Sequence, residues 1–278
     1  MNGNLPASHP SVDYYDSDYP GIGTSVHEEN LDDVLERQGL AYDIERYSGL
    51  ARETSGQILE LCCGTGRVAI PLARMGARVV AVDISEAMLN RFRQKIEQEP
   101  QAVRDRLQLV LQDITQLDLG PSRFELAIVS FNSLLLLTTR REQQTALAGV
   151  ARHLEPGGRL AIDVVNPLAL PLDGDPNPKP FFTRRHPNRN RLYTRFAAMG
   201  PMGPDQRQRL YGWYDELDEQ GRVLRTPYSM YWRPIFRSEL ELMLEASGLE
   251  VAGVEGGHRS EAFAARSPRM FVVARRPR

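Results

Sequence analysis

The feature that most constrains the fold is residues 57–83, which read QILELCCGTGRVAIPLARMGARVVAVD. An apolar run ending in Glu60 is followed by small residues, an amphipathic helical pattern and a second apolar run ending in Asp83. This order predicts a strand, a glycine turn, a helix and a second strand that ends in a carboxylate. Glycine lets backbone N–H groups approach a ligand, and the carboxylate can accept hydrogen bonds from a ribose diol. The stretch therefore predicts a site for a nucleoside-like cofactor.

The glycines alone leave two cofactors open. Gly64, Gly66 and Ala69 also fit G-x-G-x-x-A, the fingerprint of nicotinamide dinucleotide sites. Glu60 separates the two readings, because an anionic side chain near the helix N-terminus repels the pyrophosphate of a dinucleotide. A cofactor with an ammonium group is attracted instead. S-adenosylmethionine (SAM) carries an amine, a carboxylate and a sulfonium on one short tail, so Glu60 favours it.

The segment 60–66, ELCCGTG, resembles the acidic glycine motif of class I SAM-dependent methyltransferases, usually written E/D-x-G-x-G-x-G. The resemblance implies cofactor contacts from Glu60, Cys62, Gly64 and Gly66. Cys62 stands where the first glycine of the motif is usual. Because cysteine carries a Cβ, we expect a negative φ at this residue.

Later segments resemble the same family in the expected order, over residues 43–166 and again over 236–277. Asp83 resembles the acid that holds the ribose hydroxyls, and Ile84 the residue against the adenine face. Asp113, after a third apolar strand, resembles the acid that accepts from the adenine amino group. The resemblance implies further cofactor contacts from Tyr14, Tyr19, Met88, Ile114, Ser130 and Phe131.

The resemblance implies an α/β fold with a doubly wound, mostly parallel, seven-stranded Rossmann-like sheet. Residues 1–52 are expected to form an N-terminal arm and helical cap, with a tyrosine-rich loop at 13–21 and helices at 28–37 and 41–52. Residues 53–170 are expected to form the SAM-binding core, with helices at 67–75, 85–98 and 140–153. A lid is expected at 171–235, and residues 236–278 return to the core.

The lid prediction comes from a change in pattern after the fifth strand. Residues 167–180 are rich in proline and glycine and indicate a break. Alternating segments with aromatic residues follow at 192–198, 206–217 and 222–232, and they predict a small antiparallel sheet. Such a sheet covers the pocket mouth, because ligands bind at the carboxyl ends of strands in doubly wound folds. The layout resembles glycine and amino-sugar N-methyltransferases, which carry a similar insertion.

Methyl transfer from a sulfonium is an in-line displacement, so much of the work is positioning of the acceptor. Asn132 follows the fourth strand and can orient an acceptor through its amide, or pack against the turn. His258, in a loop after a terminal strand, is a candidate general base, and a solvated histidine is the alternative. The other candidate acceptor contacts are Tyr15, Tyr193, Tyr211 and Trp213; for the lid aromatics, the alternatives are a sheet core or a dimer interface.

Composition limits the remaining classes of function. The formal net charge is −2, with 41% hydrophobic and 25% charged residues, which is typical of a soluble globular protein and argues against a dedicated nucleic-acid surface. No apolar run approaches the ~20 residues of a membrane span, and the N-terminus lacks a signal pattern, so we expect a cytoplasmic protein. The two cysteines are adjacent, which indicates neither a disulfide framework nor a metal site.

The sequence thus predicts a SAM-dependent methyltransferase acting on N, O or C of a small-molecule acceptor of secondary-metabolite type. Its product would be S-adenosylhomocysteine, and a homodimer is compatible with the sequence. One alternative is a noncatalytic or non-methylating protein with the same fold. A second, disfavoured by Glu60, is an NAD(P)-dependent oxidoreductase. The sequence identifies neither the acceptor nor its reacting atom, nor whether a general base is used.

Overall fold

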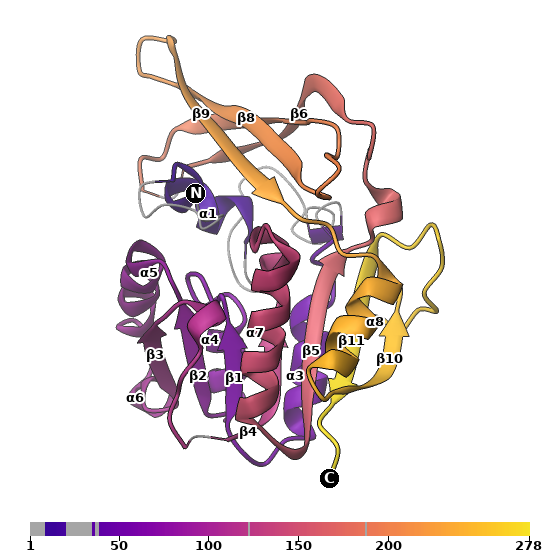
Figure 1. Ribbon diagram of the computed structural model, residues 1–278. Helices are drawn as coiled ribbons and strands as arrows, with labels where there is room; N and C mark the ends of the chain where they lie inside the picture. Colours follow the sequence, from indigo (N-terminus) through magenta and orange to yellow (C-terminus); the bar gives the residue numbers. More distant parts are fainter. Residues whose placement is uncertain (1–8, 21–34, 37–38, 122, 187) are drawn as a thin grey trace.

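The computed structural model describes residues 9–20, 35–36, 39–121, 123–186 and 188–278. Its larger sheet has seven strands in the order β10-β11-β5-β4-β1-β2-β3, with β11 antiparallel to both of its neighbours and the other pairs parallel (Figure 1). The strands are β1 (Ile58–Leu61), β2 (Val79–Asp83), β3 (Leu107–Leu111), β4 (Phe124–Val129), β5 (Leu154–Val165), β10 (Glu250–Glu255) and β11 (Arg269–Arg275). The doubly wound, mostly parallel α/β fold is confirmed.

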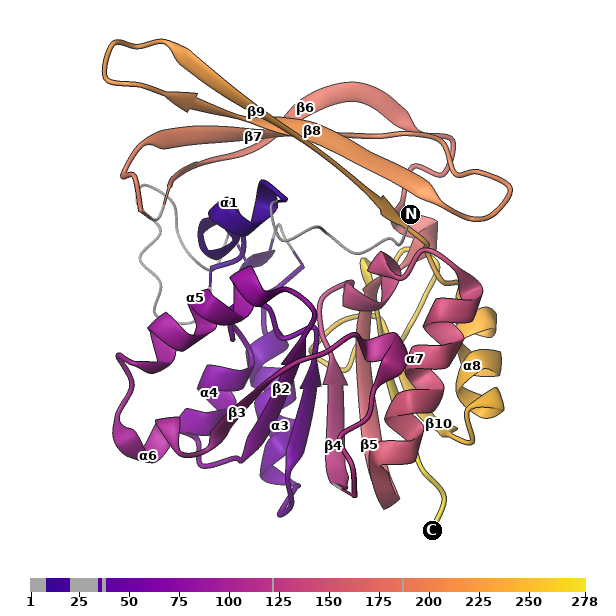
Figure 2. The same ribbon diagram turned by 60° about the vertical axis from the view of Figure 1, so that its left-hand side comes forward.

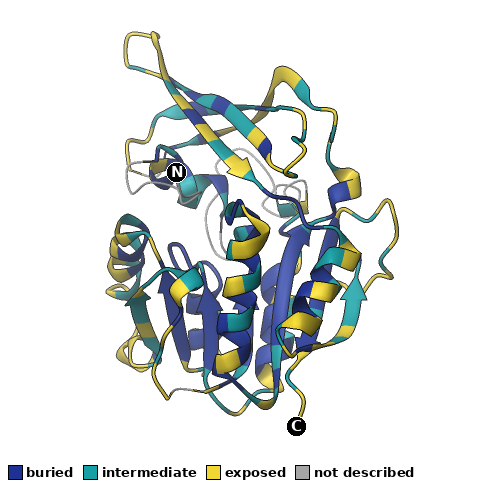
Figure 3. Ribbon diagram, viewed as in Figure 1, coloured by how far each residue is buried: buried dark blue, intermediate teal, exposed yellow. Residues whose placement is uncertain are grey.

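Helices cover both faces of this sheet. On one face α3 (Asp43–Arg52), α4 (Ala69–Arg74) and α5 (Glu86–Ile96) pack against β1 and β2, and on the other lie α7 (Arg140–His153) and α8 (Arg237–Ala246). Because both faces are covered, β1 and β2 are buried along their whole length (Figure 3). Short helices α6 (Gln101–Arg104), η1 (Ile114–Gln116), η2 (Ser133–Leu136) and η3 (Pro167–Ala169) complete the core.

The helix predictions for the core hold, with shifts of a few residues at the ends. The hydroxyl of Ser85 accepts a hydrogen bond from the Met88 N–H and caps α5. Thr139 and Glu142 form a capping box at the start of α7. The helix expected at 28–37 lies outside the described residues except for residues 35–36, which are helical. Among the described residues, no helix combines the length and apolar character that crossing a membrane requires.

A second, antiparallel sheet lies over the carboxyl ends of the parallel strands (Figure 2). We call it the lid sheet; its strands are β6 (Asp175–Arg185), β7 (Leu192–Met199), β8 (Gln208–Leu217) and β9 (Val223–Trp232). Three of the four were predicted. β6 was interpreted as part of a break because of its prolines, but as an edge strand it needs fewer ladder donors and tolerates them.

The tyrosine-rich segment is a helix, α1 (Ser11–Asp18), so the prediction of a loop at 13–21 is wrong. α1 lies between the lid sheet and the core (Figure 2). The sequence gives little sign of it, because its acidic and aromatic residues are not arranged as one apolar stripe. The contacts of α1 with the lid sheet on one side and with the core on the other explain why this segment is helical.

One face of α1 is joined to the lid sheet through a buried carboxylate. Asp18 is fully buried and accepts hydrogen bonds from the hydroxyls of Tyr193 (2.7 Å) and Tyr214 (2.8 Å). Arg195 of β7 pairs with the same carboxylate at 3.0 Å. The ring of Tyr14 stacks on Tyr214 with centroids 3.8 Å apart. These contacts make α1 part of the core of the lid sheet.

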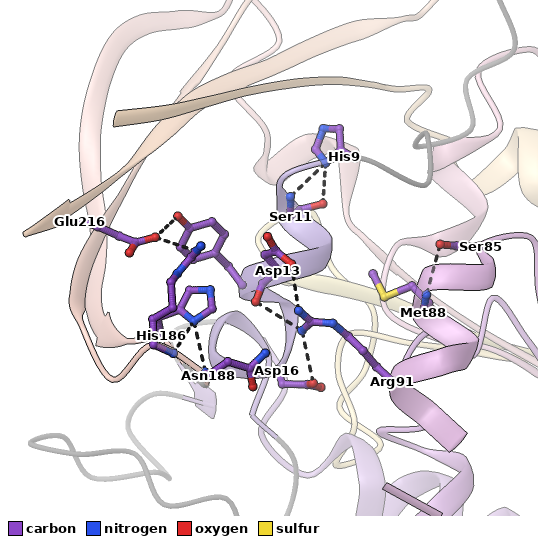
Figure 4. Close-up of polar contacts among 12 residues, drawn as sticks. His9, Ser11, Asp13, Asp16, Ser85, Met88, Arg91, His186, Asn188 and Glu216 are labelled. Carbon is purple, nitrogen blue, oxygen red and sulfur yellow. Dashed lines mark hydrogen bonds and ion pairs between the residues drawn. The ribbon is translucent and has the colours of Figure 1, made fainter. Parts of the chain in front are cut away.

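The other face of α1 is joined to the cofactor-loop side of the molecule. Asp13 pairs with Arg91 of α5 at 3.0 Å, and Asp16 lies 3.8 Å from the same guanidinium (Figure 4). The Thr65 hydroxyl donates to Asp16 at 2.6 Å, and Lys95 also pairs with Asp16. α1 therefore connects the lid sheet to the segment that follows β1.

The buried pair predicts a large effect of one substitution in α1. Asp18→Asn leaves Arg195 buried without its counter-charge, and we expect a loss of about 3 kcal/mol in the free energy of unfolding. The matched control is Asp13→Asn, because the Asp13 side chain is 61% exposed and its ion pair contributes less than about 1 kcal/mol. Urea unfolding of the two variants measures this difference; equal stabilities would contradict the role given to Asp18.

Candidate functional site

The loop after β1 makes a sharp turn, in which three residues have left-handed backbone angles. φ is 55° at Cys62, 55° at Gly64 and 81° at Gly66, so the expectation of a negative φ at Cys62 is wrong. The turn is fixed from below, since the Cys63 N–H donates to the Val82 carbonyl at 3.0 Å. A side chain at Gly66 would meet the buried ring of Phe92 at 2.3 Å, so only glycine fits there. The loop thus holds backbone groups at the carboxyl ends of β1 and β2.

A cavity opens at this edge of the sheet, and most of the predicted cofactor residues line it. These are Cys62, Gly64, Asp83, Ile84, Met88, Asp113 and Ile114. The prediction did not include Val12 of α1 or Ser85, and after β4 it named Ser130 and Phe131 rather than the residues that line the cavity. Tyr15, which we expected at the acceptor, also lines this cavity. The further lining residues are Ser133, Leu136 and Leu137.

Two carboxylates face the cavity in fixed orientations. Asp83 accepts from the backbone N–H of Gly64 and of Ser85, each at 2.8 Å. Asp113 accepts from the backbone N–H and the hydroxyl of Thr115, each at 2.8 Å, all through one oxygen. Ile84 is 43% exposed between them, an unusual position for a large apolar side chain. The arrangement offers two anionic acceptors and an apolar face, which suits a ribose and an adenine ring.

A buried carboxyl group, that of Glu60, and a buried guanidinium, that of Arg67, lie beneath the loop. Burial raises the pKa of Glu60 to about 8, against the opposing influence of the Arg67 guanidinium. Arg67 pairs with Asp43 of α3 at 2.7 Å. Glu60 Oε2 and Arg67 Nη1 have no hydrogen-bond partner in the described part of the chain. These two atoms therefore remain buried and unmatched near the glycine loop.

The side chain of Tyr15 closes the cavity from the side of α1. Its hydroxyl would lie 3.3 Å from a Cβ at Gly64, so the ring covers the loop. Burial raises the pKa of Tyr15, so the hydroxyl stays neutral and can donate a hydrogen bond. Tyr15 thus ties the cavity wall to the helix that also carries Asp18.

Besides Glu60, five predicted cofactor residues do not line the cavity. Tyr14 of α1 is buried against the lid sheet, with its hydroxyl donating to Glu216. Gly66 lies below the loop against Phe92, and the Ser130 carbonyl accepts from the Ser133 hydroxyl at 2.7 Å. Phe131 and Tyr19 form a separate aromatic pair with ring centroids 5.1 Å apart.

The predicted acceptor residues are placed mostly in structural contacts. The Asn132 side chain accepts from the Val165 N–H at 2.7 Å and joins β4 to β5. Tyr193 is buried beside Asp18. Tyr211 and Trp213 lie on the face of the lid sheet opposite the buried Tyr214, where Trp213 stacks on Phe196. Alternation correctly put Tyr211 and Trp213 on one face, but it does not reveal which face α1 covers.

The candidate base His258 does not line the cavity. Its Nε2 lies 3.2 Å from the buried carboxylate of Asp163, and its Nδ1 lies 3.2 Å from the Ala41 carbonyl. Two residues near the site, Arg67 and Arg269, were not among the predicted site residues. Arg67 directly follows the glycine motif, so its position was a usable signal. Arg269 lies far along the chain, and nothing local marks it.

Residues 58–158 match the model of a methyltransferase domain family. A cypemycin N-terminal methyltransferase from Streptomyces sp. is 30% identical over 228 residues, covering 79% of this chain and 82% of the relative.

Two solved structures resemble all or nearly all of the chain. The CcbJ methyltransferase from Streptomyces caelestis has a TM-score of 0.74 at 25% identity, with both chains fully covered. CalS10, an amino pentose methyltransferase from Micromonospora echinaspora, has a TM-score of 0.67 at 23% identity, covering 90% of this chain and 100% of CalS10. The second likeness shows the fold alone.

The raised pKa of Glu60 predicts a pH-dependent stability. The folded protein binds this proton more tightly than the unfolded chain, whose pKa is near the ordinary 4.5. The resulting stabilisation is complete below pH 4.5 and is lost as pH rises to about 8. Glu60→Gln should flatten this part of the curve, while Glu97→Gln, an exposed control, should not. Unfolding midpoints across this range measure the effect; parallel wild-type and Glu60→Gln curves would contradict it.

The left-handed Cys62 predicts that glycine is tolerated there. A non-glycine residue at φ 55° costs about 1–3 kcal/mol, which offsets the flexibility that glycine adds to the unfolded chain. Cys62→Gly should therefore leave the thermal midpoint unchanged or raise it. Cys63→Gly is the control; Cys63 is buried with a φ outside the left-handed region, so we expect a loss of about 2 kcal/mol. A larger loss for Cys62→Gly than for Cys63→Gly would disprove the strain argument.

Proposed function

The chain belongs to the class I SAM-dependent methyltransferases, and from that premise we propose that it methylates an amine nitrogen of a small-molecule acceptor. The family acts with SAM, and the relatives above include biosynthetic methyltransferases. The observation that carries the cofactor part of the proposal is the pair of unmatched buried groups, Glu60 Oε2 and Arg67 Nη1. They complement the ammonium and the carboxylate of the methionine tail, whereas Glu60 would repel a pyrophosphate.

The residues around the cavity fit the rest of the cofactor. Asp83, held by the Gly64 and Ser85 N–H groups, is oriented to accept from the ribose hydroxyls. Asp113 would accept from the adenine amino group, with Ile84 and Met88 against the ring. Tyr15 would donate to the tail from above the glycine loop. When bound, SAM supplies a methyl group on a cationic sulfur, and the C–S bond breaks as the acceptor atom forms the new bond.

The described histidines favour an acceptor that needs little base catalysis. His9, His153, His186 and His258 each bond to neighbouring groups and none lines the cavity. Burial and the neighbouring Arg189 keep the pKa of His186 below its ordinary value. A neutral amine attacks through its own lone pair and releases its proton afterwards, whereas a hydroxyl gains from a base in the transition state. The name of the cypemycin relative, an N-terminal methyltransferase, is consistent with an amine.

A panel of paired acceptors tests the reaction. Each amine, among them an amino sugar and a peptide with a free N-terminus, is incubated with SAM beside the matched hydroxyl or acetylated compound. We expect a mass gain of one methyl group and release of S-adenosylhomocysteine with at least one amine and with none of its controls. Methylation of a hydroxyl compound instead would overturn the choice of nitrogen, and bound but unconsumed SAM would indicate the noncatalytic alternative.

Cofactor binding should be coupled to proton release. At pH 7 the Glu60 carboxyl, with a pKa of about 8, is mostly protonated, and the ammonium of SAM favours its ionised form. Calorimetry of SAM binding in buffers of different ionisation enthalpy should show protons released by the wild type. Glu60→Gln should bind more weakly and release none, while Glu97→Gln should match the wild type. Equal release by Glu60→Gln would contradict the contact with the tail.

A further inference from the structure

Three buried arginine–aspartate pairs meet around one pair of aromatic rings at the carboxyl end of β4. Each guanidinium lies within hydrogen-bonding distance of its carboxylate, and each pair comes from a different part of the chain. The pairs are Arg67–Asp43 (2.7 Å) from the loop before α4 and from α3, Arg269–Asp163 (2.8 Å) from β11 and β5, and Arg195–Asp18 (3.0 Å) from β7 and α1. All six side chains are at least nine-tenths buried.

The rings at the centre are Tyr19 and Phe131, which meet edge to face at 5.1 Å. The guanidinium carbon of Arg269 lies 5.0 Å from the centroid of Phe131, and that of Arg67 lies 5.9 Å from it. From the lid sheet, Arg195 lies 5.9 Å from the ring of Tyr19 and donates to its hydroxyl at 3.1 Å. These distances are within the range of cation–π attraction.

The backbone at Phe131 is strained. Its φ of 43° is unusual for a bulky residue, and Asn132 follows with a φ of 63°. The conformation is held by β5, because the Asn132 N–H donates to the Asp163 carbonyl at 2.9 Å and its side chain accepts from Val165. Asp163 thus holds the backbone beside Phe131 through its carbonyl, and the guanidinium near the Phe131 ring through its carboxylate.

The network behind Arg269 is charged and closed to water. Asp163 is fully buried between Arg269, whose Nε donates at 2.9 Å, and His258 at 3.2 Å. Burial alone would favour the neutral acid, but the charge of Arg269 and the hydrogen bond from His258 hold the pKa of Asp163 below its ordinary value. Arg269 is therefore held by this ion pair, with its guanidinium carbon near the ring of Phe131.

The aromatic pair is also next to the cavity. β4 pairs with β1 up to Val129 and Leu61, so Phe131 and the loop at Cys62 leave the sheet side by side. Ser133, two residues after Phe131, lines the cavity, as does Tyr15, one helical turn before Tyr19. Near neighbours of both rings along the chain thus line the cofactor cavity, and Arg195 joins Tyr19 to the lid sheet.

We propose that Arg269 is a positioning residue for methyl transfer, which fixes the ring of Phe131 so that Phe131 and Tyr19 form the wall where the acceptor nitrogen meets the transferred methyl group. The inference rests on the proposed function and adds to it the place of reaction. The nitrogen gains positive charge as it takes the methyl group, and the faces of the two rings attract that charge. Each nearby guanidinium carries its own carboxylate, so it adds little net repulsion.

The test observes the methyl group directly and needs no acceptor. SAM labelled with ¹³C at its methyl group is bound to the protein, and the ¹H and ¹³C shifts of that methyl are recorded by NMR. In the wild type we expect a shift away from free SAM, caused by the ring current of Phe131. Phe131→Leu should remove most of it, and Arg269→Lys, which keeps the charge but loses the planar guanidinium, should move or broaden the signal.

Calorimetry and a matched variant separate positioning from folding. Both variants should bind SAM within about threefold of the wild type. Arg237→Lys is the control, because Arg237 also lies near a ring, 5.7 Å from Phe263, and pairs with Glu241 on the exposed face of α8. With an acceptor from the panel above, kcat for Arg269→Lys should fall about tenfold to a hundredfold at an unchanged KM for SAM.

The outcomes distinguish a failure of the proposed function from a failure of the role given to Arg269 and Phe131. A wild type without any bound-SAM signal would overturn the proposed function. A wild-type signal that Phe131→Leu and Arg269→Lys both leave in place would overturn this inference alone. A signal altered in Phe131→Leu but not in Arg269→Lys would leave the wall without its positioning residue and would also count against the proposal.

Discussion

The buried carboxylate of Asp18 is the interaction on which the geometry of the lid and of the cavity depends. Two tyrosine hydroxyls and one guanidinium of the lid sheet converge on it, and a charge buried at this depth is tolerated only with such partners. Asp18 ends α1, and Tyr15 on the same helix covers the glycine loop. The position of the lid sheet and the shape of the cofactor cavity are therefore set by one helix.

Buried charge is used in two different ways in this molecule. In the three arginine–aspartate pairs each charge faces an opposite charge, so the pairs support the rings of Tyr19 and Phe131. Glu60 and Arg67 are each left with an unmatched atom, so they disfavour the empty site and favour a ligand that supplies both charges. The matched pairs surround the place proposed for methyl transfer, and the unmatched atoms lie where the methionine tail is proposed to bind.

The residues that line the cavity directly after β1, β2 and β3 were predictable because they follow strand ends. Asp83, Asp113 and the glycine loop line the cavity as the sequence indicated, since parallel strands bring their carboxyl ends to one edge. The positions of the lid residues were not predictable in this way. Alternation placed Tyr211 and Trp213 together, but the face that α1 covers is the other one, which buries Tyr14, Tyr193 and Tyr214 instead. Local sequence pattern did not predict β6, because of its prolines, or the helix α1, because of its mixed composition.

The sequence by itself determined the strand ends and the cofactor loop of the core, because these follow from apolar runs, glycines and caps within a few residues of one another. The seven-stranded sheet was implied by the resemblance to a family. Only the tertiary structure decided that α1 is a helix, which face of the lid sheet is inward, that Cys62 is left-handed and that Arg269 lies beside Phe131. The physical reason is distance along the chain. Asp18 and Tyr214 are 196 residues apart, and Arg269 and Asp163 are 106 apart, so no local pattern encodes their contacts.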